Sequence, residues 1–348
     1  MGLASAGAFA QFADQTLAVL QIGDTANRVN TGIEYSLSNF TTAGTQVGSA
    51  LATGIFDSGT ATSNGNLALD PLTGNLWMQG YATVSGSGSL PNSATVATRF
   101  KSFDTATGTF GANNDIARTS MYNAGNFRSV HVVNGVRLST GSGTLGSSRI
   151  ESTAPLTGAG TAVSIASTRV GYIYGSTAFY TTQTGLFSQP LTATTTTGET
   201  SLLTTAAADV QDFVFNSDMS SLYLASVGTG QQGILKYTRN GSGTYDFAYN
   251  MAIAGTTSLL ANTTGTRYLA MGNDGTLYAT TARSSDSSAT GNNQIVKILD
   301  TGAASTFSVI ATSSNNTLYK GIEVVPEPAS MAVLGLGLLG LARRRRNK

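Results

Sequence analysis

The sequence predicts an all-β fold, and more specifically a β-propeller of about seven four-stranded blades followed by a short hydrophobic helix at the C-terminus. Three observations support this prediction: a composition poor in charge and rich in glycine, two phrases that recur along the chain, and turn residues between short apolar runs. Such runs, bounded by Gly, Asn, Asp and Ser, are typical of strands joined by hairpins.

The composition favours β-structure and excludes sites that depend on cysteine. Charged residues make up 11% of the 348 residues, glycine occurs 41 times, and cysteine does not occur. Few charges and many hydroxyl groups are typical of Thr- and Gly-rich β-proteins, whereas helical surfaces are rich in Lys and Glu. Without cysteine the chain has no disulfide, thiolate metal site or cysteine nucleophile, so its stability depends on the size of its core.

The charge balance argues against nucleic acid as a partner. The whole chain carries a formal net charge of +1, but residues 326–348 contain five basic residues and one acidic residue. Without this segment, 14 basic and 17 acidic residues remain, which gives a net charge of −3. A mildly acidic domain has no basic surface that would attract phosphates, so we expect no nucleic-acid binding.

Two phrases recur along the chain. In the first, a turn leads into leucine and an aromatic residue, as in Leu76-Trp77, Leu222-Tyr223, Leu277-Tyr278 and Leu318-Tyr319. In the second, a lysine stands in a short apolar stretch before a glycine-containing turn. Its copies contain three of the five lysines of the chain, Lys101, Lys236 and Lys297. Such repetition predicts a fold assembled from one stacked supersecondary unit.

One copy of the unit is regular enough to be divided into strands. Residues 210–215, 221–226, 234–240 and 245–250 are runs of aromatic and β-branched residues, and turn residues separate them. Four antiparallel strands within about 40 residues form one propeller blade. Because so small a sheet cannot bury both faces alone, the blades must stack around an axis.

About seven such units fit between Gln15 and Val325, and residues 111–207 are the least regular part. The last phrase, at 318–319, is not followed by a full blade. We therefore expect strands from both ends of the chain to complete one sheet and close the ring. A two-sheet sandwich and a right-handed β-helix are the alternative folds.

Few residues point to catalysis or to a cofactor. His131 is the only histidine, and its apolar neighbours place it on a strand, so we interpret it as a packing residue rather than a general base. Glycines match the dinucleotide-binding pattern at 228–233 and 335–340, but one match lies between strands and the other in the apolar tail. We therefore predict no catalytic residue, no cofactor and no metal site.

Acidic and aromatic residues nevertheless supply candidates for a polysaccharide site. Cleavage of a glycosidic bond needs two carboxyl groups that face each other across the sugar. The candidate acids are Asp70, Asp104, Asp212, Asp218, Asp274 and Asp300. Three of them (70, 218 and 274) stand in or beside turns, where Asp caps its own backbone, and loops such as 272–275 could hold calcium without any EF-hand spacing. Exposed aromatic residues could stack on sugars, with Tyr81, Tyr122 and Phe127 as candidates, whereas the repeated aromatic residues are expected to pack between blades.

The C-terminal segment combines three parts in a fixed order. Val325, Pro326, Glu327 and Pro328 precede an apolar run at 329–342, which is followed by Arg343, Arg344, Arg345 and Arg346. A helix of this length extends about 21 Å, and the prolines prevent it from continuing upstream, whereas a bilayer core is about 30 Å thick. The run can insert transiently while the arginines stay in the cytoplasm, but it is too short to span the bilayer core as a permanent anchor. A weak tail anchor is the alternative.

With these parts the tail resembles the PEP-CTERM sorting domain of Gram-negative bacteria that produce exopolysaccharide. The resemblance rests on residues 325–328, on the Gly- and Leu-rich run at 334–341 and on the arginine cluster. It implies recognition by an exosortase, which is a membrane cysteine transpeptidase, transient insertion into the inner membrane, cleavage near Pro-Glu-Pro, and export. The body also resembles, more loosely, the propeller-like ectodomains found upstream of such tails.

Three segments follow from these predictions. Residues 1–10 end in an A-x-A cleavage site and are interpreted as the remnant of a signal peptide, residues 11–325 as the propeller-like ectodomain, and residues 326–348 as the sorting signal. We predict an exported, non-enzymatic protein of the cell envelope or extracellular matrix, with a structural or binding role in exopolysaccharide or biofilm. A propeller enzyme acting on polysaccharide and an adhesin for calcium or carbohydrate are the alternatives.

Overall fold

The computed structural model describes residues 15–326, without 24–27, 29, 89, 91–92, 94, 118–120, 123–124, 144–146, 153–155, 157, 165, 254–258 and 284–291. These residues form strands and no helix, which confirms the predicted all-β class. None of the described segments is therefore a helix that could cross a bilayer. The expected signal-peptide remnant at 1–10 and the expected hydrophobic helix at 329–342 lie outside the described residues.

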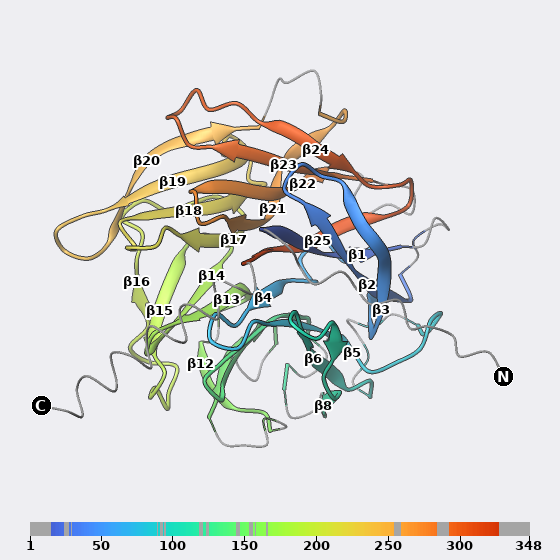
Figure 1. The fold of residues 1–348 in the computed structure, drawn as a ribbon. Coiled ribbons are helices and arrows are strands. Elements are labelled where there is room, and N and C mark those ends of the chain that lie inside the picture. The colour runs from blue at the N-terminus through green and yellow to red at the C-terminus, as the bar shows by residue number, and fades with distance from the viewer. Residues whose placement is uncertain are drawn as a thin grey trace, which may run out of the picture.

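The strands form a propeller-like ring of antiparallel sheets (Figure 1). Four sheets have four strands each, which pair in chain order. The first contains β9 (Phe127–Val133), β10 (Val136–Gly141), β11 (Ser148–Glu151) and β12 (Thr161–Ser164). The second contains β13 (Thr168–Tyr174), β14 (Thr177–Thr182), β15 (Leu186–Pro190) and β16 (Thr200–Ser201). The third contains β17 (Val210–Phe215), β18 (Ser221–Ser226), β19 (Gly233–Arg239) and β20 (Tyr245–Ala252), and the fourth β21 (Thr263–Met271), β22 (Thr276–Arg283), β23 (Gln294–Leu299) and β24 (Ser308–Thr312).

The fifth sheet has nine strands and divides into two groups. One group contains, in spatial order, β25 (Leu318–Val325), β1 (Thr16–Ile22), β2 (Gly32–Thr41) and β3 (Gln46–Ser58). The other contains β4 (Leu67–Leu69), β5 (Asn75–Tyr81), β6 (Thr98–Asp104), β7 (Thr109–Phe110) and β8 (Asn114–Ile116). Strands β7 and β8 both pair with β6, and a single residue pair, Phe56 with Tyr81, joins the two groups.

The innermost strands close into a ring. Each of β4, β9, β13, β17, β21 and β25 contacts the next, and β25 contacts β4. The sandwich and the β-helix are therefore wrong. The described strands form six groups, and the number of about seven blades stays a prediction.

Strands from both ends of the chain close the ring. Strand β1 lies between β2 and β25, and its register with β25 runs from Thr16 opposite Val325 to Ile22 opposite Leu318. Residues 17–20 of β1 are fully buried. The expectation that strands from the two ends complete one sheet is confirmed.

The two recurring phrases occupy neighbouring strands. Tyr223 on β18 stands opposite Lys236 on β19, and Tyr278 on β22 stands opposite Lys297 on β23. The lysine nitrogen atoms lie 5.6 and 6.0 Å from the centres of these tyrosine rings. A cation this close to a ring contributes about 0.5–1 kcal/mol at an exposed site. In these two sheets the repeat therefore reflects a stabilising cross-strand pair, whereas Lys101 stands opposite Met78 and lies over the ring of Phe110.

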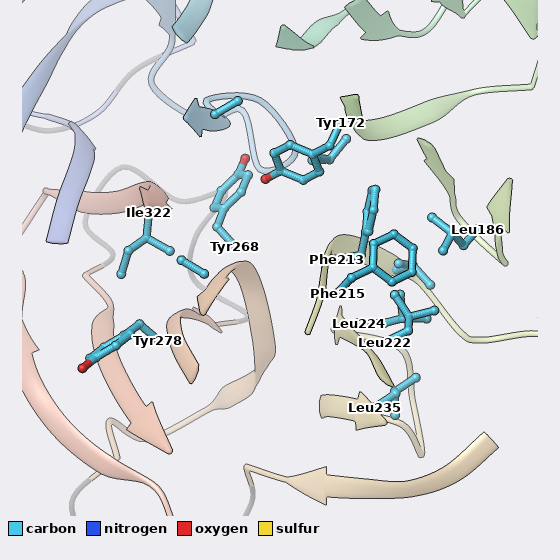
Figure 2. Close-up of a cluster of buried hydrophobic side chains, with 14 of the residues drawn as sticks. Tyr172, Leu186, Phe213, Phe215, Leu222, Leu224, Leu235, Tyr268, Tyr278 and Ile322 are labelled. Carbon is cyan, nitrogen blue, oxygen red and sulfur yellow. The ribbon is translucent and has the colours of Figure 1, made fainter. Parts of the chain in front are cut away.

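Apolar packing joins the sheets near the axis. Figure 2 shows side chains of the largest core cluster, which come from several sheets. Phe213 meets Tyr172 edge to face at 5.1 Å between ring centres, and Phe215 meets Phe179 in the same way at 5.2 Å. Edge-to-face pairs add about 0.5–1.5 kcal/mol to the burial of their area, so the aromatic residues fix neighbouring sheets relative to one another.

Replacing Gly321 on β25 with alanine tests the close packing of the closing strand. A Cβ atom at this position would lie 2.3 Å from the backbone nitrogen of Leu67 and 2.7 Å from the carbonyl carbon of Asn66. Such overpacking lowers the free energy of unfolding by about 1–3 kcal/mol, which urea denaturation measures. Gly241→Ala is the control, because no atom lies within 4 Å of its added Cβ. Equal unfolding midpoints for the two variants would contradict this packing.

Candidate functional site

A cavity of about 510 Å³ lies where the inner strands of the ring end. Its lining includes the last residues of β4, β13, β17 and β21, the end of β25 and the turn 272–275. Because the inner strands run in the same direction around the axis, their C-terminal ends meet at one place. The cavity is therefore lined by residues from segments that are far apart in the sequence.

The segment 61–66, which connects β3 to β4, lies at the end of the ring axis opposite the cavity. Its carbonyl oxygens accept hydrogen bonds from Arg267 at Thr62 (2.8 Å), from the hydroxyl of Tyr268 at Asn64 (2.6 Å) and from the backbone of Gly321 at Gly65 (2.7 Å). The donors stand on the inner strands β21 and β25, upstream of the residues that line the cavity. The segment thus fixes the upstream halves of these strands and leaves the cavity at their downstream ends.

Aromatic rings from β13 and β17 form the apolar wall of the cavity: Tyr172, Tyr174, Phe213 and Phe215. Tyr174 packs edge to face on Phe215, with 5.3 Å between ring centres and an angle of 82° between ring planes. Tyr172 packs on Phe213 and on His131 in the same way. The wall is therefore held in place by the core behind it.

Glu323 of β25 is the only carboxyl group among the described residues of the lining. The side chain is partly exposed, because it borders the cavity. Burial and the nearby Asp212 carboxyl group raise the pKa of Glu323 well above its usual value, and the backbone of Leu69 partly offsets this. The same two carboxyl groups and burial raise the pKa of the Tyr174 hydroxyl.

His131 connects three inner strands. Its Nδ1 accepts a hydrogen bond from the backbone of Ile173 at 2.8 Å, so its Nε2 carries the proton that it donates to the carbonyl oxygen of Leu69 at 3.0 Å. Burial lowers the pKa of His131 to about 4, so the ring is neutral at pH 7. Because both nitrogens have backbone partners, the interpretation of His131 as a packing residue is confirmed.

Asp212 lies next to the cavity but is fully buried. Its carboxyl oxygens accept hydrogen bonds from the backbone of Phe213 (2.7 Å) and Leu269 (3.0 Å) and from the hydroxyl of Tyr172 (3.2 Å). Burial raises its pKa to about 8, although these hydrogen bonds act in the opposite direction. Asp212 therefore holds β13, β17 and β21 together instead of facing a substrate.

The other candidate acids lie outside the cavity. Each of four of them accepts a hydrogen bond from a backbone N–H two residues further on, at 2.8 to 3.0 Å: Asp70, Asp104, Asp218 and Asp274. Asp300 accepts hydrogen bonds from Lys236, Tyr223 and Tyr249, which together hold its pKa at about 2. The six candidate acids therefore do not meet in one cleft.

The sequence did not single out Glu323, although a signal was present. Glu323 is an isolated acid in the apolar closing phrase at 318–325, where a strand buried on both faces would carry only apolar residues. An acid at such a position indicates a polar group that faces an axis or a cavity.

The three aromatic residues named as candidates for sugar stacking are buried. The exposed fractions of Tyr81, Tyr122 and Phe127 are 0%, 0% and 1%. Tyr122 stacks on Phe127 at 5.6 Å between ring centres, and the hydroxyl oxygen of Tyr81 accepts a hydrogen bond from the backbone of Phe127. These three candidates therefore do not offer an exposed ring to a sugar, because they fill the core between two sheets.

The remaining sequence candidates are placed as follows. Residues 228–233 connect β18 to β19 as a turn between strands, as expected for a match that does not bind a nucleotide. The second glycine match, at 335–340, lies outside the described residues. Within the described part of the chain, no cluster of three or more His, Asp or Glu residues could hold a metal ion.

The sorting residues begin where the ring ends. Val325 is the last residue of β25, is 2% exposed and stands opposite Thr16 of β1. Pro326 follows and borders the cavity. Glu327, Pro328 and the cluster Arg343, Arg344, Arg345 and Arg346 lie outside the described residues.

Residues 324–346 match the family description of the PEP-CTERM protein-sorting motif. This match covers the tail that the sequence singled out, and it confirms the resemblance. It implies an exported protein associated with the cell envelope. No curated protein matches the chain.

Solved structures resemble the ring at low sequence identity. One chain of a nidogen–laminin complex has a TM-score of 0.51 and 10% identity, with coverage of 89% of this chain and 99% of that chain. A proposed 6-phosphogluconolactonase from Bacteroides fragilis has a TM-score of 0.50 and 14% identity, with coverage of 85% and 82%. At this identity the likeness shows the fold alone.

Asp212 makes the stability of the protein depend on pH. Its pKa is about 8 in the folded protein, against a usual value of 3.8. Because the unfolded chain loses this proton first, the free energy of unfolding falls as the pH rises from about 4 to about 8, by up to about 1.4 kcal/mol per pH unit. We expect Asp212→Asn to reduce this slope, measured by urea denaturation at a series of pH values.

Asp218→Asn is the control for this slope. Asp218 caps an exposed turn, and its hydrogen bonds lower its pKa, so it is ionised in both states over the upper part of this pH range. An equally steep slope in Asp212→Asn and in the unsubstituted protein would contradict the prediction.

Proposed function

We propose that the protein is exported to the surface or extracellular matrix of a Gram-negative bacterium, where it has a non-enzymatic structural or binding role in the exopolysaccharide layer or biofilm. An exosortase recognises the tail during its transient insertion into the inner membrane and cleaves near Pro-Glu-Pro. The observation that carries the proposal is the position of the motif, which starts at the end of the ring-closing strand.

The architecture fits removal of the tail. All the described strands end at or before Val325, and the first proline of the motif follows at once. The buried side chain of Val325 and its pairing with Thr16 lie on the ring side of this boundary. Cleavage near Pro326-Glu327-Pro328 therefore releases a ring that keeps both of its closing strands.

The lining of the cavity supports a role in binding more than in catalysis. Hydrolysis of a glycosidic bond uses two carboxyl groups across the sugar. Among the described residues, Glu323 faces the cavity without a second carboxyl group, since the oxygens of Asp212 are engaged by three donors. One similar structure is named for an enzyme and another for a complex of two proteins, so the fold does not decide between these roles.

The intact mass of the protein recovered from the surface of its own host tests the sorting proposal. We expect a mature chain that ends near Pro328, because the exosortase removes the hydrophobic run and the arginines. Glu327→Ala removes the acidic residue of the motif and should leave the tail in place. Ser330→Ala, two residues beyond the motif, should be processed normally. A surface protein that retains residues 343–348 would overturn the proposal.

Two truncated chains test whether the ring is complete before the motif. A chain that stops after Pro326 keeps β25, and its free energy of unfolding should lie within about 0.5 kcal/mol of that of the full chain. A chain that stops after Thr317 lacks β25, so the core of β1 is uncovered and the protein should fail to unfold cooperatively. Urea denaturation measures both. Loss of the folded ring in the chain that stops after Pro326 would show that the tail is part of the fold.

A further inference from the structure

We propose that the cavity at the end of the ring axis binds an organic ammonium cation, with Glu323 as its counter-ion and the rings of Tyr172, Tyr174, Phe213 and Phe215 as its walls. This inference rests on the binding role proposed above and names the class of ligand. It is independent of how the tail is processed, because the residues concerned all lie within the ring.

The first argument is a carboxyl group that has no cationic side chain beside it in the cavity. No lysine or arginine is found among the described residues that line the cavity. The groups that act electrostatically on Glu323 are Asp212, which is also acidic, and the backbone of Leu69. A carboxyl group that is partly shielded from solvent and has no cationic side chain beside it is complementary to a positively charged ligand.

The other groups that face Glu323 do not supply this charge. His131 on β9 is neutral, because its nitrogens bond to the backbone and burial lowers its pKa. Tyr172 and Tyr174 on β13 carry hydroxyl groups with raised pKa values, and Asp212 on β17 is acidic. The lining residues of β4 and β21 are not titratable, nor are the three lining residues of the turn at 272–275. An anionic ligand would therefore meet two acidic groups and no cation.

The second argument is the aromatic wall. Ammonium groups are attracted to the faces of aromatic rings, and sites built from several rings bind quaternary ammonium ligands. Tyr174 is partly exposed, and its ring is fixed by edge-to-face contact with Phe179 and Phe215. The volume of about 510 Å³ falls within the range of small-molecule sites. The rings and the carboxyl group thus meet in one preformed space.

Binding of a cation is coupled to the proton of Glu323. Burial and Asp212 favour the neutral form of Glu323 in the absence of ligand. A nearby positive charge favours the ionised form, so the ligand displaces a proton. A permanently charged ligand should therefore bind more tightly as the pH rises from the usual pKa of a glutamate towards the raised pKa of Glu323.

Isothermal titration calorimetry of the full chain with choline tests the proposal. Choline has a permanent charge, and its uncharged carbon isostere carries a tert-butyl group in place of the trimethylammonium group. We expect choline to bind at least about tenfold more tightly than the isostere, since the two differ only in charge. Glucose, which has hydroxyl groups and no charge, should not bind.

Matched variants locate the site. Glu323→Gln should weaken choline binding at least about tenfold without lowering the unfolding midpoint, because it removes a buried titrating group and keeps the shape. Tyr174→Leu should weaken choline binding and leave the isostere unaffected, because it removes a ring face. Asp115→Asn is the control, because it makes the same change in net charge at an exposed ion pair with Arg99 on β6.

The outcomes are distinct from those of the sorting experiments. Absence of choline binding, equal binding of choline and its isostere, or unchanged binding in Glu323→Gln would each overturn the ammonium site. None of these results would alter the mass of the processed protein. Loss of choline binding in Asp115→Asn as well would show that the effect comes from net charge, and would also overturn the assignment to this cavity.

Discussion

The antiparallel pairing of β25 with β1 is the constraint on which the rest of the structure depends. An open ring would expose the buried face of β1 and an unpaired strand edge. Strand β25 closes the ring and is also an inner strand, so it meets both β21 and β4. The same strand places Glu323 at the cavity and ends at Val325, within the first residues of the sorting motif at 324–346. The closure of the ring, part of the cavity lining and the start of the sorting motif therefore lie on one strand of eight residues.

Polar side chains lie near the axis of the ring, whereas apolar side chains fill the spaces between the sheets. Lys320 is fully buried and donates a hydrogen bond to the carbonyl oxygen of Ala61, and Tyr35 donates to Asp57. Buried polar groups are tolerated when they are paired, and these pairs fix the segment that enters the axis. At the other side of the axis, the backbone of Leu69 and the carboxyl group of Asp212 act on Glu323, and no Lys or Arg is among the described residues of the cavity lining. The two ends of the axis therefore differ: paired polar groups stabilise the fold at one end, and the cavity at the other end is suited to a ligand.

Local signals in the sequence predicted some elements closely. The strands expected at 210–215 and 221–226 are β17 and β18, and the closing phrase is β25. These succeed because strand propensity and turn chemistry act over a few neighbouring residues. Whether Tyr81, Tyr122 and Phe127 are exposed could not be predicted, because burial depends on which sheet packs against the residue, and the sequence does not contain that information locally.

By itself the sequence determined the all-β class, the repeated strand unit and the sorting tail, because each depends on residues that are neighbours in the chain, and the incomplete last repeat indicated the closure of the ring. Only the tertiary structure decided the grouping of the strands, the burial of Asp212 and the meeting of Glu323 with four aromatic rings. Glu323 and Tyr172 are 151 positions apart in the sequence and share a cavity because each stands on an inner strand. Such a meeting depends on the curvature and closure of the whole ring, to which every sheet contributes.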